Sequence, residues 1–263
     1  MKTSITILFV IVCILKFNAQ HYTHEIGVFV GSTSLQSDYG QRGHFKSEIK
    51  NTDLSFSVSH YLSFYNRTLR WDPNNVLHNH LMVKTELQYI KSTNLEHVGK
   101  WAEKQSIGGA KLRAMKGSVN MFNVGINLEY YLNPLEEFIY PHSDMLLNPF
   151  FTFGAQYSFY NNDLRSELGD WTQDPSVLPN KYQDPNHLSI GKGETFAFNV
   201  GIGTRIKITE ELDLVPQVNY IYFLTDELDG LIADVFENRN NEWAFNFQIG
   251  LIYHLNFSYP LFD

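Results

Sequence analysis

Two histidines separated by one residue are the first candidates for chemistry in this 263-residue chain. In an extended segment, His78 and His80 would lie on one face and could hold a metal ion between their imidazoles. The sequence offers no third ligand nearby, and the pair falls in a polar turn at the edge of a predicted strand. We therefore expect no metal site here.

A second candidate motif is an acidic segment around Gly230. Its carboxylates are Asp226, Glu227, Asp229 and Asp234. Loops that bind Ca²⁺ place their ligands at a fixed spacing, which this segment lacks, so we expect a solvated acidic loop. The glycine pairs at 108–109 and 191–193 do not lead from a strand into a helix, as a phosphate-binding loop does. No cofactor is expected.

A third possibility is the Ser/His pair that some lipid-modifying barrels carry at their rim. His97, His142 and His187 fall in predicted connections, and serines are abundant. No spacing singles out one pair, so we expect no enzyme. A lipid-modifying barrel enzyme is the weaker alternative.

The N-terminus is organised like a secretory signal peptide. Lys2 precedes an apolar run over 5–15 and a polar patch over 16–20. The run is shorter than the roughly 20 residues that a membrane-spanning helix needs. We expect cleavage after Ala19, leaving 20–263 as one domain.

Charge and cysteine content exclude further classes of protein. The only cysteine, Cys13, lies in the expected signal peptide, so the mature chain has neither disulfides nor thiolate metal sites. Loss of Lys2 and Lys16 takes the formal charge from −8 to −10. Nucleic-acid binding needs a basic surface, and the chain has no run of Lys or Arg, so we expect no nucleic-acid partner.

Alternation of apolar with small or polar residues predicts about eight β-strands after the signal peptide. The alternating segments are 25–31, 54–63, 81–89, 122–132, 151–159, 195–208, 214–224 and 242–256. Most exceed the usual strand of about 5–6 residues and approach the roughly 9–11 of a tilted transmembrane strand. One face is apolar and aromatic, and the other carries the charges.

This pattern favours an all-β fold, a transmembrane antiparallel up-and-down β-barrel of about eight strands with its apolar face in lipid. Strand length, the signal peptide and an even strand number all support it, and a secreted β-sandwich is the alternative. We expect a multi-pass protein of the bacterial outer membrane.

The connections alternate in length. With the N-terminus in the periplasm, the external loops fall at 33–53, 91–118, 161–193 and 226–242, and the other turns at 65–77, 133–147 and 209–211. Long external loops are typical of such barrels, although the first two periplasmic turns are longer than usual. Pro216 cannot donate to a strand ladder and is expected to mark a bulge. Because aromatics and Arg dominate contact energy, the candidate partner-contact residues are Tyr39, Arg42, Trp101, Arg113 and Trp171.

The inward faces carry charges of both signs. They are Glu25, Lys84, Glu86, Glu129, Arg205 and Lys207. Side chains fill the interior of an eight-stranded barrel, and buried charges must be paired. We expect a structural network, with Arg205 pairing with Glu129 or Glu86, rather than an ion path.

Several segments resemble known barrels. Residues 24–31, HEIGVFVG, match the H-E-[IV]-G-V-x-x-G opening of small outer-membrane barrels of the Bacteroidetes, an opening shared with PorG-like proteins of the type IX secretion system. The blocks that resemble a flavobacterial barrel family are 36–43, 112–117, 122–125, 156–160 and 226–231. Where the PorG-type opening often continues with a G-D-[IV]-G-like turn, this chain has SDYGQ at 37–41.

The resemblance implies a barrel without a catalytic motif. It also implies a role as an accessory subunit of an envelope assembly, with outer-membrane lipid and other envelope proteins, secretion-system components among them, as partners. A stand-alone barrel for adhesion or envelope integrity is the alternative function.

Overall fold

A computed structural model describes residues 23–39, 51–64, 75–135, 138, 145–233 and 241–255. The expected signal peptide (1–19), Arg42 and the C-terminal tail after the last strand lie outside the described residues. So do Asp234 of the acidic segment and His142.

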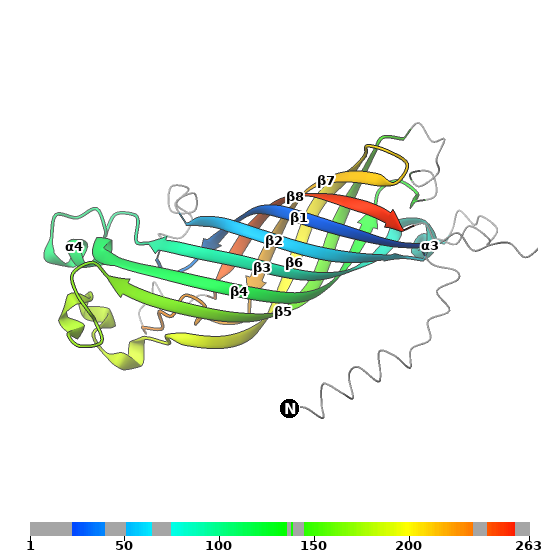
Figure 1. The fold of residues 1–263 in the computed structure, drawn as a ribbon. Coiled ribbons are helices and arrows are strands. Elements are labelled where there is room, and N and C mark those ends of the chain that lie inside the picture. The colour runs from blue at the N-terminus through cyan, green and yellow to red at the C-terminus, as the bar shows by residue number, and fades with distance from the viewer. Residues whose placement is uncertain are drawn as a thin grey trace, which may run out of the picture.

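Within these residues, eight antiparallel strands close into one barrel in sequence order (Figure 1). They are β1 (Thr23–Gln36), β2 (Thr52–Ser63), β3 (Leu81–Glu96), β4 (Met115–Tyr131), β5 (Leu147–Ser166), β6 (Gly191–Lys207), β7 (Leu212–Phe223) and β8 (Trp243–Leu255). Each strand pairs with its neighbour along the chain, and β1 pairs with β8 to close the sheet. The predicted up-and-down barrel is confirmed.

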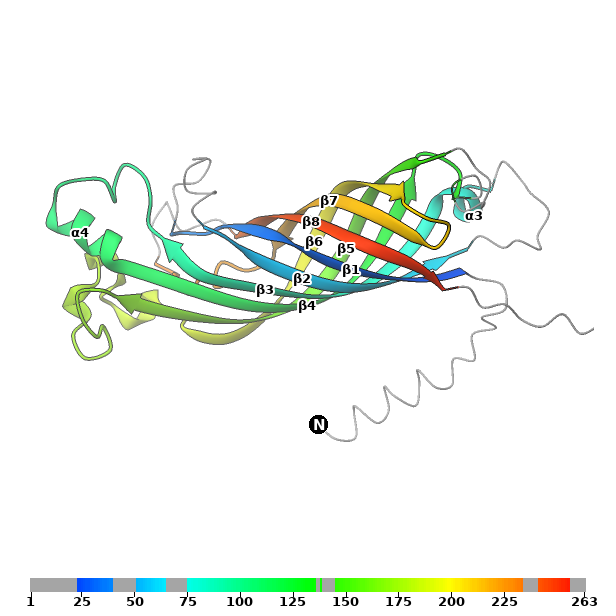
Figure 2. The same ribbon diagram turned by 45° about the horizontal axis from the view of Figure 1, so that its top comes forward.

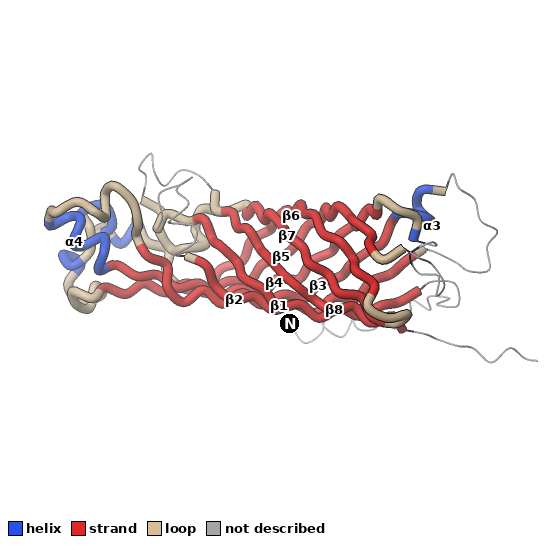
Figure 3. The backbone as a smooth tube through the Cα atoms, turned by 90° about the horizontal axis from the view of Figure 1, so that it is seen from above, coloured by secondary structure: helices blue, strands red, loops and turns tan. Residues whose placement is uncertain are grey.

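Short helices lie at the two ends of the barrel (Figure 3). They are α3 (Val76–His80), α4 (Ile107–Ala114), and the 3-10 turns η2 (Pro175–Val177), η3 (Asn180–Tyr182) and η4 (Pro185–His187). The Asn75 side chain caps α3, and the Ser106 side chain caps α4 by accepting from the Gly109 amide. None of the described helices has the length and apolar content to cross a membrane.

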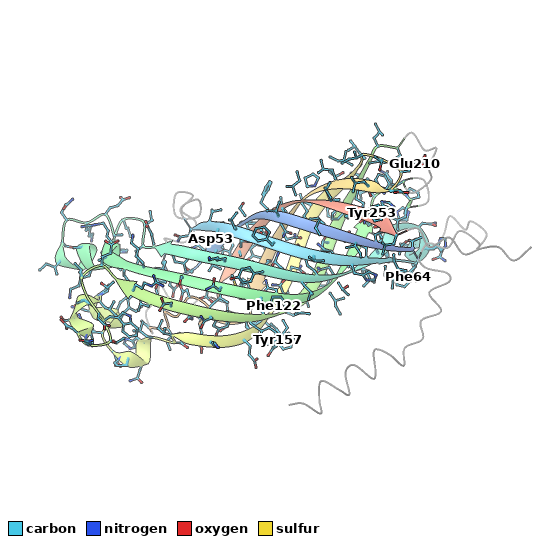
Figure 4. All side chains as sticks on the ribbon, viewed as in Figure 1. Asp53, Phe64, Phe122, Tyr157, Glu210 and Tyr253 are labelled. Carbon is cyan, nitrogen blue, oxygen red and sulfur yellow. The ribbon has the colours of Figure 1, made fainter. Side chains whose placement is uncertain are left out.

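The outside of the barrel carries a continuous apolar belt. Phe153 is 63% exposed and Phe247 62% exposed, and Figure 4 shows Phe122 and Tyr157 pointing outward from the middle of the barrel. Other exposed members are Ile26, Val28, Val58, Leu87, Ile126, Leu128, Phe151, Phe196, Phe198, Ile202, Ile249 and Leu251. Water-soluble monomers do not expose so large an apolar surface. The belt is therefore the lipid-facing surface of a transmembrane barrel.

Several strands continue beyond this belt. Above Phe122 the outward residues of β4 become polar, at Lys116, Ser118 and Asn120, and above Phe159 those of β5 become Asn161, Asp163 and Arg165. Figures 1 and 2 show the strands reaching past the rest of the barrel toward α4. The ends of the predicted loops 91–118 and 161–193 are therefore strand, at 91–96, 115–118, 161–166 and 191–193, because cross-strand pairing continues where the lipid ends.

Pro216 does not mark a bulge, so that prediction was wrong. Gly203 pairs with Gln217, and Ile206 pairs with Leu214 in the same register, so the break in pairing between them adds no residue to either strand. Across β8 the register is also unbroken at Pro216. A register shift occurs instead between Ser92 and Leu95 of β3.

The belt predicts that a charged residue introduced within it destabilises the barrel more than one introduced beyond it. Phe153→Arg should reduce the free energy of unfolding by roughly 2–4 kcal/mol, the cost of Arg near the bilayer midplane. The matched control is Leu168→Arg, because Leu168 is 55% exposed but lies beyond the belt, where surface substitutions change stability by about 0.5 kcal/mol or less. Urea unfolding in lipid vesicles measures both. Equal effects of the two substitutions would contradict the assignment of the belt.

Candidate functional site

Arg205 of β6 is fully buried and is one of four polar side chains linked in a closed cycle, here called the charge cycle. Its Nη2 donates to Glu25 Oε2 over 2.5 Å, and its Nη1 lies 3.5 Å from Asp213 Oδ2. His254 completes the cycle, with Nε2 2.9 Å from the same Asp213 oxygen and Nδ1 3.5 Å from Glu25 Oε1. The four residues come from β1, β6, β7 and β8, so the cycle links strands on both sides of the closing β1–β8 pair.

Aromatic rings surround this cycle. The Arg205 guanidinium lies 5.1 Å from the ring centroid of Tyr61 and 5.3 Å from that of Tyr131. The Tyr131 hydroxyl donates to Glu129 Oε2 over 2.6 Å. The π faces favour the cation, while the hydroxyl satisfies a neighbouring carboxylate, so the aromatic rings add to the charge pairing.

A second ion pair lies nearby on β3. Lys84 Nζ is 3.3 Å from Glu86 Oε2 and 5.0 Å from the centre of the Phe29 ring. Asn127 donates to the same Glu86 oxygen over 3.4 Å. Lys207 is half-buried and lies opposite Asp213 in the pairing of β6 with β7, with its Nζ 5.1 Å from the Phe138 ring centroid.

The structure gives Arg205 different partners from those we expected. It pairs with Glu25 and Asp213, not with Glu129 or Glu86. Our prediction also omitted Asp213, although the alternation of β7 places it inward, two positions before Val215. Extending the period-2 pattern toward the turn would have found it.

The middle of the barrel is filled by neutral amides and hydroxyls. Gln217 donates to Gln248 over 2.8 Å, and Gln248 donates to Ser57 over 3.2 Å. Asn123 donates to Gln88 over 2.8 Å on the other side. These hydrogen bonds join side chains of different strands inside the barrel, whereas Gln217 Oε1 and Asn123 Oδ1 are buried without a hydrogen-bond partner among the described residues.

The mouth at the α4 end is closed by a hydrophobic plug. Its main members are Leu35, Tyr39, Leu95, Leu178, Tyr182, Leu228 and Leu231. Tyr39, expected to contact a partner, is 0% exposed, because the chain after β1 turns inward and lays its ring over Gly117. A Cβ at Gly117 would approach the Tyr39 ring to 2.5 Å, so the plug depends on glycine there.

The other predicted loop residues divide between packing and surface. Trp171 packs against the plug and donates its indole N–H to the Leu164 carbonyl over 2.8 Å. Arg113 donates to the carbonyls of Ala102 and Lys104. Trp101 is 52% exposed, and Arg113 is also exposed, so these two candidates lie on the surface.

The histidines of the connections have structural contacts. The His97 ring lies between Tyr39 and Tyr182, at centroid distances of 4.8 and 6.4 Å, and desolvation lowers its pKa to about 3. His187 Nδ1 lies 2.7 Å from the Lys181 carbonyl oxygen. Because α3 is helical, His78 and His80 do not share an extended face, and His80 Nδ1 lies 2.8 Å from the Tyr131 carbonyl oxygen.

The acidic segment reaches into the plug, which corrects our expectation of a solvated loop. Asp229 is buried and accepts from the amides of Asp38 and Leu231, over 2.7 and 2.9 Å. Its burial raises its pKa to about 6, with a further contribution from Asp226. These backbone contacts tie the β7–β8 loop to the segment that follows β1.

Glu242 lies against this segment at the start of β8. It is 0% exposed, and neither carboxylate oxygen has a hydrogen-bond partner among the described residues. Its pKa is raised well above the usual range by burial, and then by Asp229, Asp38 and Asp226. The described part of the chain contains no group of three or more His, Cys, Asp or Glu arranged to hold a metal ion.

These features define a small transmembrane β-barrel with a filled lumen. No family model and no curated protein matches the sequence. A major outer membrane protein of Thermus thermophilus is similar in fold, with a TM-score of 0.48, 11% identity, and 88% of this chain and 99% of that chain covered. Neisserial surface protein A has a TM-score of 0.46 and 11% identity, with 88% of this chain and 97% of that chain covered. The attachment invasion locus protein of Yersinia pestis has a TM-score of 0.42 and 10% identity, with 89% of this chain and 99% of that chain covered.

The charge cycle makes a quantitative prediction. Arg205→Met should reduce the free energy of unfolding by roughly 3–5 kcal/mol, because it leaves buried carboxylates without their cation. Adding Glu25→Gln and Asp213→Asn should recover much of this loss, since the uncompensated charges disappear. Urea unfolding in vesicles measures the series. A single variant as stable as the parent, or a triple variant less stable than the single one, would contradict the cycle.

The plug should respond to pH. The folded-state pKa of Asp229 is about 6, above the usual carboxyl pKa of about 3.9. The protonated carboxyl therefore contributes its full stabilisation of the plug below about pH 3.9. This stabilisation is lost as the pH rises through the folded-state pKa of about 6. We expect amide protection over 226–233, corrected for intrinsic exchange, to fall between pH 4 and pH 7.

Asp229→Asn should flatten this pH profile. Asp170→Asn is the control, because Asp170 is exposed and the Thr172 hydroxyl and amide lower its pKa. Hydrogen exchange with mass spectrometry reports both variants. An unchanged pH profile in Asp229→Asn would exclude this carboxyl as its source.

Proposed function

We propose that this protein is a non-enzymatic barrel of the bacterial outer membrane that serves as an accessory subunit of an envelope assembly. The observation that carries this proposal is the filled lumen. The Arg205 cycle occupies one end, the amide layer the middle, and the hydrophobic plug the mouth. A barrel filled in this way is a rigid membrane anchor, and its contacts with other molecules are made at its ends.

The end that bears α4 has the form of a platform. The parts of β4 and β5 beyond the belt present polar outward faces, and Lys116 of β4 pairs with Glu96 of β3 over 2.7 Å. Continuous strand pairing holds these walls out of the lipid without a flexible linker. Such a platform suits a subunit that keeps a partner at a fixed height and orientation.

Two more specific functions are each supported by a different observation. A place in the type IX secretion machinery is supported by the resemblance of residues 24–31 to the opening of PorG-like barrels. A stand-alone adhesion barrel is favoured by the apolar side chains exposed at the far tip, Trp101 and Ile107. Copurification in fixed ratio separates the two.

The test is a native pull-down from outer membranes solubilised in mild detergent. An epitope tag is inserted in the turn at 168–170, where the side chains are exposed. We expect stoichiometric recovery of other envelope proteins, identified by mass spectrometry, and secretion-system components among them would support a place in the type IX secretion machinery.

The control is the Arg205→Met variant carrying the same tag, which tests whether recovery needs an intact barrel. Recovery of the parent barrel alone, still folded and heat-modifiable on a gel, would overturn the accessory-subunit proposal. Equal recovery of partners by the parent and by Arg205→Met molecules that have lost their heat-modifiable mobility would show non-specific capture and would overturn it too.

A further inference from the structure

The segment 98–114, here called the apex, comprises the β3–β4 connection and α4. It is the part of the barrel farthest along the α4 end in two views (Figures 1 and 2). Seven residues of β4, Met115 to Met121, separate it from Phe122 at the edge of the belt. At about 3.4 Å per residue and a tilt of about 40°, the apex stands roughly 18 Å above the lipid-facing surface.

The charge of the apex is opposite to that of the chain. It carries four basic residues, Lys100, Lys104, Lys111 and Arg113, against the single acid Glu103, whereas the whole chain has a formal charge of −8. A local excess of positive charge on an acidic protein attracts anions to that place alone. The apex is therefore suited to an anionic ligand.

The exposed centre of the apex is one aromatic ring with two ammonium groups over it, so a sugar ring that stacks on the same face displaces an ammonium toward its own acidic groups. Lys104 Nζ lies 3.7 Å and Lys100 Nζ 5.3 Å from the ring centroid of Trp101, which is 52% exposed. An indole face stacks on the C–H face of a sugar ring, and an ammonium pairs with a carboxylate or sulfate. Together these groups fit an acidic sugar.

Other contacts hold this arrangement in place. Arg113 donates to the carbonyls of Ala102 and Lys104, and the Glu103 amide donates to the Gly99 carbonyl over 3.0 Å. Lys111 donates to the Ser176 carbonyl and fastens α4 to the β5–β6 connection. The backbone around Trp101 is thus fixed by groups other than the indole and its two lysines, which lowers the entropy lost on binding.

We propose that the apex binds an anionic polysaccharide outside the cell, with Trp101 stacking on a sugar ring and Lys100 and Lys104 pairing with its acidic groups. One ring and two cations form a small contact, far below the roughly 800 Å² per partner of a stable protein interface. A repeating polymer compensates for a weak single contact by multivalency. The height of the apex above the belt separates it from lipid headgroups. This inference does not depend on the envelope-assembly proposal.

The test uses the full barrel in phosphatidylcholine nanodiscs, with dextran sulfate and alginate as anionic probes and dextran as the neutral one. Biolayer interferometry should show binding of both anionic polymers, weakening with salt, and none of dextran. Lys100→Gln with Lys104→Gln, and Trp101→Ala alone, should each weaken binding by about tenfold.

Two matched controls keep the outcome specific. Lys192→Gln removes an exposed lysine on β6, and Leu168→Ala removes an exposed apolar side chain of the neighbouring connection; both should bind like the parent. Heat-modifiable gel mobility confirms that each variant is folded. Absence of binding by the parent, equal binding of dextran, unchanged binding by the apex variants, or preference for phosphatidylglycerol vesicles over dextran sulfate would overturn the proposal.

Discussion

The buried guanidinium of Arg205 is the constraint on which the interior depends. Lipid outside the barrel requires apolar outward residues, so period-2 alternation directs polar and charged side chains into a lumen too narrow for bulk water. A cation there is tolerated only where anions and hydrogen bonds compensate it. Glu25 and Asp213 supply the anions, and His254 bridges them. Because these residues lie on four strands, the cycle satisfies the charges only when β1 and β8 are paired in this register.

The space for these groups comes from glycine placed opposite large side chains. A Cβ at Gly250 would approach the Phe29 ring to 2.2 Å, and one at Gly203 would approach the Phe150 ring to 2.4 Å. The large residue from one strand therefore lies over the bare backbone of another. This pairing of sizes fills a tapering interior densely, and it explains why the inward faces alternate between bulky and minimal residues.

The strands and their faces could be predicted from the sequence because alternation is local. Phe196, Phe198 and Val200 point outward for a reason visible within their own segment. The partner of Arg205 could not be predicted in this way, since Glu25 lies 180 residues away and meets it only after the barrel closes. Tyr39 was misplaced for a related reason, because its segment is polar and turns inward to cover a lumen that the sequence does not display.

Ionisable side chains are buried at both ends of the lumen, and each end accommodates them in a different way. At the α3 end, opposite charges from fixed strands neutralise one another. At the mouth, Asp229 and Glu242 are buried beside the apolar side chains of the plug, and the pKa of each carboxyl rises instead. A group that keeps its proton near pH 6 stabilises the plug only while it is neutral. The charge cycle therefore fixes the barrel, whereas the plug is the part of the interior whose stability depends on pH.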